Sequence, residues 1–257
     1  MSKIYTTEIA SDKLLSDNPL HQRLLKPYVI ASEWIKGDLL EVGCGEGRGI
    51  SIMLPLVRSY TAIDRIEPAI VGLRRKFPKA KFVCESLPPL PFSDSSFDSI
   101  VSFQVIEHIQ DDVLFLKEIR RVLRSGGVAL ITTPNRHFSL SRNPWHVREY
   151  TPDELKRLAV SIFENVEMKG IAGNEKVMTY HEENRKSVNW LMRWDIFDLQ
   201  HKLPAAVLRI PYDLLNRLNR IRLQQDSNGL TQSISHEDYM LTEKAENALD
   251  LFLIVRK

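Results

Sequence analysis

Short apolar runs alternate along the chain with segments in which apolar residues recur every three to four positions. The short runs are typical of buried strands, and the periodic segments are typical of helices that bury one face. The predicted strands are 38–42, 60–64, 81–84, 99–103, 128–133, 166–170 and 249–255. The predicted helices are 20–34, 48–56, 68–77, 111–123 and 152–160. This alternation predicts an α/β fold with a mostly parallel sheet and helices on both of its faces.

Residues 174–247 interrupt the alternation, because they place about seventy residues of mainly amphipathic helix between the sixth and seventh predicted strands. We expect one domain over residues 1–257, with 174–247 as a helical insertion that forms a cap or lid. Pro204 and Pro211 are expected to break or kink this run into short helices. Its apolar side chains recur at helical spacing, and we expect them to pack over the ligand edge of the sheet. They are Trp190, Trp194, Phe197, Val207, Ile210, Leu214, Leu218 and Ile221.

Charge is distributed unevenly. The whole chain has a formal net charge of +2, but residues 185–222 contain eight basic residues and three acidic ones. A basic lid predicts an anionic acceptor, and a basic amphipathic helix can also lie on an anionic membrane surface. A solvated charged face is the alternative to both. The sequence does not indicate an oligomeric state.

Composition narrows the class of protein. No stretch approaches the roughly 18 uninterrupted apolar residues of a membrane span, and the first residues lack the apolar core of a signal peptide. The two cysteines, Cys44 and Cys84, lie in predicted core segments. They fit a reducing compartment and exclude a disulfide scaffold or a multi-cysteine zinc site. We therefore expect a cytoplasmic protein.

A glycine-rich segment, EVGCGEGRG at residues 41–49, follows the first predicted strand and opens a helix. Glycine lets the backbone turn tightly and lets a ligand approach main-chain atoms. The dinucleotide pattern G-x-G-x-x-G would need a glycine where Arg48 stands, which disfavours NAD or FAD. Asp64 ends the next predicted strand about twenty residues later, where a carboxylate can accept hydrogen bonds from both hydroxyls of a ribose. The two features together predict a nucleoside-type cofactor.

Four segments carry a family resemblance: residues 41–49, residues 62–64 (AID), residues 90–98 (LPFSDSSFD) and residues 117–127 (KEIRRVLRSGG). They resemble class I S-adenosylmethionine-dependent methyltransferases, and in particular the branch that includes the ubiquinone-biosynthesis O-methyltransferases. The resemblance covers roughly residues 36–170 and the final strand. It implies a Rossmann-like, seven-stranded sheet whose last strand is antiparallel, with S-adenosylmethionine as cofactor.

The resemblance also implies where each part of the cofactor lies. Gly43 to Gly47 would face its methionine part, Asp64 its ribose, and Glu85 with Ser86 its adenine. By position, Gln104 and Val105 would line its sulfonium end. The predicted cofactor site comprises Glu41, Gly43, Cys44, Gly45, Gly47, Asp64, Arg65, Glu85, Ser86, Gln104 and Val105.

Polar residues Glu107 and His108 follow the fourth predicted strand, on the side of an open α/β sheet where ligands bind. A sulfonium is a strong electrophile, so the site need only align the acceptor and remove its proton. The predicted catalytic residues are Glu107 or His108 as the base, and His146 to orient the substrate.

Residues 146–155, together with 104–108, resemble the metal site of small-RNA 3′-terminal 2′-O-methyltransferases. In that family two glutamates and one or two histidines hold a divalent ion, which makes Glu107, His108 and His146 the candidate ligands here. Position 104 is Gln where that site has a carboxylate, and losing an anionic ligand weakens the binding of a hard cation. A divalent metal is therefore left open but is not favoured.

These features predict a methyltransferase that acts on an oxygen of a small-molecule or saccharide-like acceptor. An RNA ribose 2′-O-methyltransferase is one alternative, disfavoured by Gln104 and by the lack of an appended RNA-binding module, so nucleic acid is not an expected partner. A non-catalytic regulator that binds S-adenosylmethionine is the other.

Overall fold

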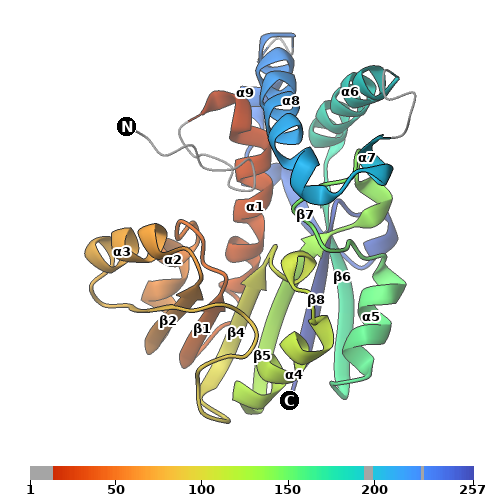
Figure 1. Cartoon of the computed structure of the whole chain (residues 1–257). Helices are drawn as coiled ribbons and strands as arrows, with labels where there is room; N and C mark the ends of the chain where they lie inside the picture. Colours follow the sequence, from red (N-terminus) through yellow and green to blue (C-terminus); the bar gives the residue numbers. More distant parts are fainter. Residues whose placement is uncertain (1–13, 194–198, 227–228) are drawn as a thin grey trace.

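The computed structural model describes residues 14–193, 199–226 and 229–257, in which eight strands form one sheet of order β3-β2-β1-β4-β5-β8-β6-β7 (Figure 1). The strands are β1 Asp38–Val42, β2 Ser59–Asp64, β3 Lys81–Cys84, β4 Phe97–Phe103, β5 Leu123–Pro134, β6 Asn165–Gly173, β7 Tyr239–Thr242 and β8 Asp250–Arg256. The described helices are α1 Asn18–Ala31, α2 Ile50–Met53, α3 Glu67–Lys76, α4 Asp112–Val122, α5 Pro152–Val160, α6 Glu175–Met192, α7 Leu199–Lys202, α8 Ala205–Asp226 and α9 Leu230–Ser233.

Strand direction is uniform over most of the sheet. Strands β1 to β5 pair in parallel, whereas β8 lies antiparallel between β5 and β6. Strand β7 pairs antiparallel with β6 at the edge of the sheet. Strands β7 and β8 therefore run against the others.

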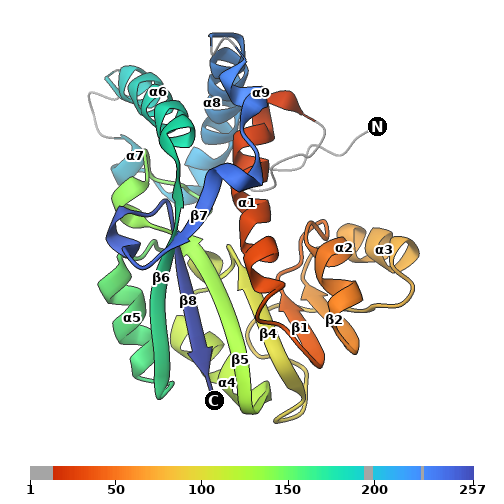
Figure 2. The same cartoon turned by 180° about the vertical axis from the view of Figure 1, so that it is seen from behind.

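The sheet separates two apolar cores, because successive side chains of a strand point to opposite faces. In β1, Leu39 packs in the core that α1, α2 and α3 cover, while its neighbour Leu40 packs in the core that α4 and α5 cover. Figure 1 shows α4 and α5 in front of the sheet, and Figure 2 shows α1 and α2 on the opposite face. Because helices cover both faces of the sheet, the strands appear in the sequence as continuous apolar runs.

The predicted α/β fold with a mostly parallel sheet and an antiparallel last strand is confirmed, but the predicted number of seven strands is wrong. The additional strand, β7, lies within the segment expected to be helical. Four residues are too short to show a strand alternation, and Tyr239 is the only one of them that is buried. The strand forms because β6 extends to Gly173 and offers it an edge for pairing.

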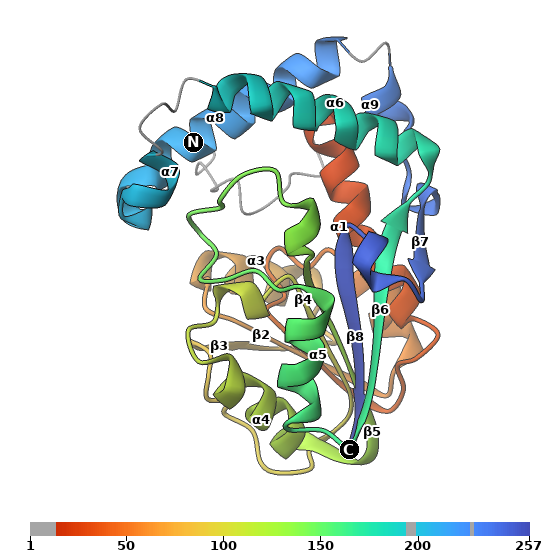
Figure 3. The ribbon, with the colours of Figure 1, turned by 90° about the vertical axis from the view of Figure 1, so that its right-hand side faces the viewer.

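Helix α6 and helix α8 lie across the carboxyl ends of the parallel strands (Figure 3). Asn219 of α8 joins them, since its Nδ2 donates to Asn184 Oδ1 at 2.7 Å and its Oδ1 accepts from Ser187 Oγ at 2.5 Å. The same helix is tied to the start of the described chain, because Arg217 and Arg220 each contact Asp17 Oδ1, at 3.2 and 3.3 Å.

The expectation that the apolar side chains of this region pack over the ligand edge of the sheet is wrong for those of them that the structure describes. Trp190, Val207, Ile210, Leu214, Leu218 and Ile221 are all exposed. Trp194 and Phe197 lie outside the described residues. The inner side of α8 instead lines a polar cavity with Tyr212, Asn216, Asn219 and Arg220, which leaves the apolar side facing outward.

Proline limits the helices here less than expected. Pro204 directly precedes α8, as a residue that cannot continue a helix would. Pro211, however, lies inside α8, which continues from Ala205 to Asp226. A proline removes only one backbone hydrogen bond, so a helix of this length can continue past it. Within the described parts of the chain, every helix is too short or too polar to cross a bilayer.

Candidate functional site

The glycine-rich loop after β1 is held against two neighbouring elements. The Gly43 backbone N–H donates to the Ile63 carbonyl of β2 at 2.8 Å. Gly43 has a φ of +79°, and a Cβ there would lie 2.3 Å from Cγ2 of Val105. Both the left-handed backbone and the close approach require glycine.

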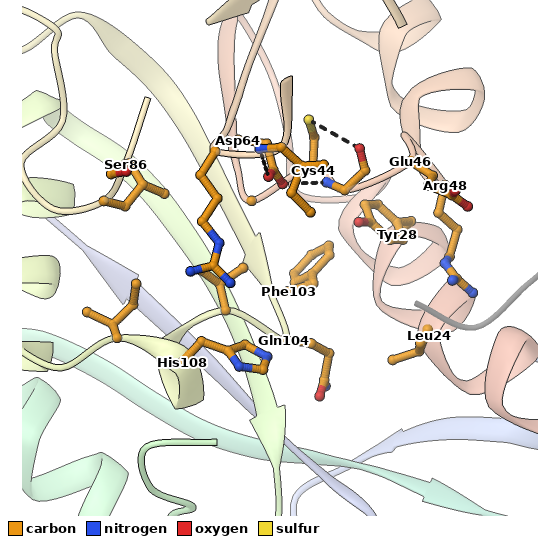
Figure 4. A pocket seen from close by; sticks show the side chains of 17 residues that line it. Leu24, Tyr28, Cys44, Glu46, Arg48, Asp64, Ser86, Phe103, Gln104 and His108 are labelled. Carbon is orange, nitrogen blue, oxygen red and sulfur yellow. Dashed lines mark hydrogen bonds between the residues drawn. The ribbon is translucent and has the colours of Figure 1, made fainter. Parts of the chain in front are cut away.

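Asp64, at the end of β2, connects this loop to the next one. Its Oδ2 accepts from the Gly45 N–H at 2.7 Å and its Oδ1 from the Ile66 N–H at 3.0 Å, which orients the carboxylate (Figure 4). Gly45 has a φ of +51°, and a Cβ there would meet no described atom within 4 Å. That side of the loop is open because it faces a cavity.

This first cavity has a volume of about 270 Å³. Figure 4 shows Asp64 and Cys44 at one end of it, and Gln104 and His108 at the other. Its walls include Gly43, Cys44, Gly45, Asp64, Arg65, Ser86, Gln104 and Val105, which are eight of the eleven residues in the predicted cofactor site.

Glu41, Gly47 and Glu85 complete the predicted set but do not line the cavity. Glu41 lies beneath the loop, where the Tyr60 hydroxyl donates to it. Burial raises the pKa of Glu41 to about 7, although hydrogen bonds from Tyr60 and Tyr28 oppose the rise. Gly47 faces Leu73 and Ile50, and Glu85 is exposed. Glu41 and Gly47 therefore contact the protein interior beneath the loop and not the cavity.

Sequence reasoning missed several residues that complete the cavity wall. Leu24 and Tyr28 come from α1, and the Tyr28 ring meets Phe103 of β4 edge-on at 4.9 Å between centroids. Arg48, Ile66, Leu87 and Ile109 also lie on the wall. No local signal marks Leu24 and Tyr28, because α1 reaches the cavity only through packing of the whole sheet.

A second cavity of about 290 Å³ lies under α6 and α8 and shares Leu24, Gln104 and His108 with the first. Gln104 therefore stands where the two cavities meet. Its backbone has a φ of +58°, an uncommon conformation for a residue with a side chain, and such strain is often concentrated at functional sites. Its Nε2 donates to Asp250 Oδ1 at 3.2 Å.

Three titratable groups gather beside this junction, and the ligand atoms of Glu107, His108 and His146 lie within 4.8 Å of one another. The Glu107 side chain is buried, and its Oε2 accepts from the Thr133 hydroxyl at 3.0 Å. Burial raises the pKa of Glu107 to about 7. This carboxyl therefore changes charge near neutral pH.

The two histidines are held in fixed orientations. His108 Nδ1 lies 2.9 Å from the Trp145 carbonyl, which can only accept, so Nδ1 carries the proton. Burial lowers the pKa of His108 to about 4, which keeps the ring neutral near pH 7. His146 uses both ring nitrogens, with Nδ1 2.7 Å from Glu149 Oε1 and Nε2 2.8 Å from Asn143 Nδ2.

The same contacts decide how well the cluster fits a divalent metal. An ion would need an ionised Glu107, yet burial favours its neutral form. An ion on His146 would have to displace Glu149 or Asn143. Because a ligand must be deprotonated and have a nitrogen or oxygen available, this donor set fits a metal poorly.

Comparison with known proteins agrees with the geometry around the glycine loop. Residues 40–131 match the family described as a methyltransferase domain. A probable S-adenosylmethionine-dependent methyltransferase of Mycobacterium tuberculosis is 41% identical over 140 residues, which are 52% of this chain and 51% of the relative. A fatty-acid O-methyltransferase of Mycolicibacterium smegmatis is 34% identical over 106 residues, 40% of this chain and 39% of the relative. The chain thus matches about half the length of the first relative and less of the second.

Among solved structures, an S-adenosylmethionine-dependent methyltransferase of Thermotoga maritima superposes with a TM-score of 0.58 at 15% identity. The superposition covers 93% of this chain and 92% of the other. At this identity the likeness establishes the fold alone.

Proposed function

We propose that this chain, which contains a class I S-adenosylmethionine-dependent methyltransferase domain, transfers a methyl group from S-adenosylmethionine to an oxygen of a small-molecule acceptor. The observation that carries the proposal is the meeting of two cavities at Gln104 and His108. One cavity would hold the cofactor and the other the acceptor. Their contact at a few side chains allows the donor and acceptor atoms to be held in line, which is the main requirement of the reaction.

The first cavity suits the cofactor at the level of single groups. The open side of Gly45 provides a cradle that a Cβ would fill, and the Asp64 carboxylate can accept hydrogen bonds from ribose hydroxyls. S-adenosylmethionine supplies a methyl group that is already activated for attack by a nucleophile. The protein's own task is therefore to bind, orient and deprotonate.

The second cavity suits a polar acceptor that carries hydroxyl groups. Side chains with amide, hydroxyl or imidazole groups line much of it, including Asn143, Tyr180, His181, Asn184, Tyr212 and Asn216. Its two arginines are each held by a buried carboxylate, Arg23 by Asp250 and Arg220 by Asp17. This pairing favours a neutral, saccharide-like acceptor over an anionic one, since little positive charge is left to attract an anion.

Glu107 is the best candidate for the base. It lines the acceptor cavity, and its raised pKa lies near the pH at which a general base is most effective. His108, which borders both cavities, would position the acceptor oxygen. His146 orients the segment that closes this side, because Glu149 and Asn143 fix its ring. The fatty-acid O-methyltransferase among the relatives supports oxygen as the acceptor atom.

Calorimetry with S-adenosylmethionine, followed by a search for S-adenosylhomocysteine with a panel of hydroxylated metabolites, tests the proposal. We expect binding, and product formation with at least one member of the panel. Lack of binding would refute the methyltransferase assignment. Binding without product across the panel would favour the non-catalytic alternative.

Removal of divalent metal is expected to leave turnover unchanged. The reason is the poor fit of the Glu107, His108 and His146 donor set to an ion. The measurement is the initial rate before and after dialysis against a chelator, with a methyltransferase of known magnesium dependence as control. A rate that disappears in chelator and returns with magnesium or manganese would show that these side chains rearrange to bind an ion.

A further inference from the structure

Helix α8 has an unusual orientation, with its polar side inward and its apolar side outward. Five apolar side chains of α8, spaced three or four residues apart, are exposed: Val207 (58%), Ile210 (81%), Leu214 (58%), Leu218 (55%) and Ile221 (37%). Pro211 and Leu215 extend the same side. Positions at these spacings share one face of an α-helix, so they form one stripe, which we call the outer stripe.

The opposite side of α8 is fully engaged with the protein. Tyr212, Asn216 and Asn219 line the second cavity, and Leu223 is buried. Arg209 stacks on the Trp145 ring at 4.2 Å, and the Trp145 indole N–H donates to Asp213 at 3.1 Å. These contacts fix the rotation of the helix, so the outer stripe cannot turn inward without breaking them.

Exposure of a continuous apolar stripe on a soluble domain points to a binding partner, because isolated proteins rarely leave such patches in water. The charges around the stripe indicate which partner. Arg222 follows Ile221 directly and lies over the Trp190 ring of α6 at 5.5 Å. Three more basic residues, Lys186 of α6, Arg193 directly after α6 and Lys202 at the end of α7, are exposed in the segment that precedes α8. The one acid of α8 whose side chain is described, Asp213, is bound to Trp145.

We propose that the outer stripe of α8 binds the surface of an anionic lipid bilayer. An apolar helix face flanked by basic residues is the combination that lies in the interface of such a membrane. The apolar side chains would enter the boundary between headgroups and acyl chains, and the flanking cations would contact the anionic headgroups.

Self-association through the stripe fits the charges less well. A symmetric dimer brings each residue close to its own copy or to nearby residues of the partner, so Arg222 and its basic neighbours would face like charges. An anionic bilayer instead offers opposite charge over the whole patch.

The position of α8 gives this contact a consequence for the acceptor. The side of α8 opposite the outer stripe lines the second cavity, so membrane binding would place the acceptor cavity next to the bilayer. An acceptor with a hydroxylated head and a lipid tail would then reach the site from the membrane. This consequence rests on the proposed function, whereas the binding itself does not.

Co-sedimentation with lipid vesicles tests the binding. The full chain is mixed with vesicles of phosphatidylcholine alone or with about one third phosphatidylglycerol, at low and high salt. We expect pelleting with the anionic vesicles, at least tenfold weaker binding to neutral ones, and loss of binding at high salt. Failure to pellet with anionic vesicles, or equal binding to both kinds, would overturn the proposal.

Two variants localise the contact. The triple variant Ile210→Ser, Leu214→Ser, Leu218→Ser removes the centre of the outer stripe and should weaken vesicle binding at least tenfold. The matched control Leu56→Ser, Val160→Ser, Met240→Ser replaces side chains that are 49%, 57% and 49% exposed on other elements, and should bind as the wild type does. Both should keep the wild-type circular dichroism spectrum and cofactor affinity, because all six side chains are on the surface.

Equal binding by wild type and the outer-stripe variant would overturn the assignment to α8. Sedimentation velocity without lipid tests the other candidate partner of the outer stripe, a second copy of the chain. A wild-type dimer that the outer-stripe variant abolishes, without vesicle binding by either, would assign the stripe to a second copy of the chain and refute the membrane proposal. Because these measurements need no acceptor, they remain informative even if the methyltransferase proposal fails.

Discussion

Replacing Asp64 by Asn is expected to weaken the binding of S-adenosylmethionine by roughly 10- to 100-fold, because a hydrogen bond to a charged acceptor contributes about 1.5–3 kcal/mol. Asn has almost the same shape but no negative charge, and it has only one oxygen in place of two. Asp64 now accepts hydrogen bonds from the N–H groups of Gly45 and Ile66. Asn would accept fewer hydrogen bonds, both from one of these two groups and from the ribose. Isothermal titration calorimetry with the cofactor measures the change.

The control for this variant is Asp94→Asn, which changes an exposed aspartate that pairs with Arg121 and does not line either cavity. Its affinity for the cofactor should equal that of the wild type. Unchanged affinity in Asp64→Asn would contradict the assignment of this carboxylate to the ribose. If the melting temperature of Asp64→Asn lies far below that of the wild type, a loss of cofactor affinity would instead be explained by a destabilised glycine-rich loop.

Replacing Glu107 by Gln is expected to lower kcat by roughly 10²- to 10⁴-fold, the usual contribution of a general base, and to leave cofactor affinity nearly unchanged. The pH profile adds a second signature. A base must be ionised to accept a proton, and burial raises the pKa of Glu107 to about 7. The wild-type kcat should therefore rise with pH up to about 7 and level off above it, and this rise should be absent in Glu107→Gln.

Stopped-time assays between pH 5 and 9, with a saturating acceptor found in the metabolite panel, measure the profile. Glu164→Gln serves as a control, because it makes the same chemical change on an exposed residue that lines neither cavity. A rate that stays flat from pH 5 to 9 would point to His108, since burial lowers its pKa to about 4 and leaves the ring able to accept a proton over the whole range. A rise near pH 7 that persists in Glu107→Gln would exclude Glu107 as the base.

The local part of the cofactor site could be predicted because each of its signals is contained in one short segment. Gly43 and Gly45 need left-handed backbone angles, and Asp64 is the last residue of a buried strand. The predicted residues that miss the cavity show the limit of such reasoning. Glu41 belongs to the same motif, but a strand side chain must point to one face or the other, and this one points to Tyr60.

The far side of the site could not be predicted in the same way. Tyr28 reaches the cavity from α1, and His146 meets Glu107 and His108 from a segment almost forty residues further along the chain. The resemblance named all three members of that cluster, but only the coordinates show that Glu149 and Asn143 engage both ring nitrogens of His146 and that Glu107 is buried. Hydrogen bonds between distant segments leave no periodic trace in a sequence.

The sequence by itself determined the α/β layering, the glycine loop and the position of Asp64, because these depend on contacts between residues close in the chain and on backbone angles that few residue types adopt. The tertiary structure decided the eighth strand, the join between the two cavities and the outward face of α8. A helical pattern shows that one side of α8 is apolar, but only the surface on which the helix packs fixes which side faces inward. Here that surface is a polar cavity, so the polar side of α8 faces the protein.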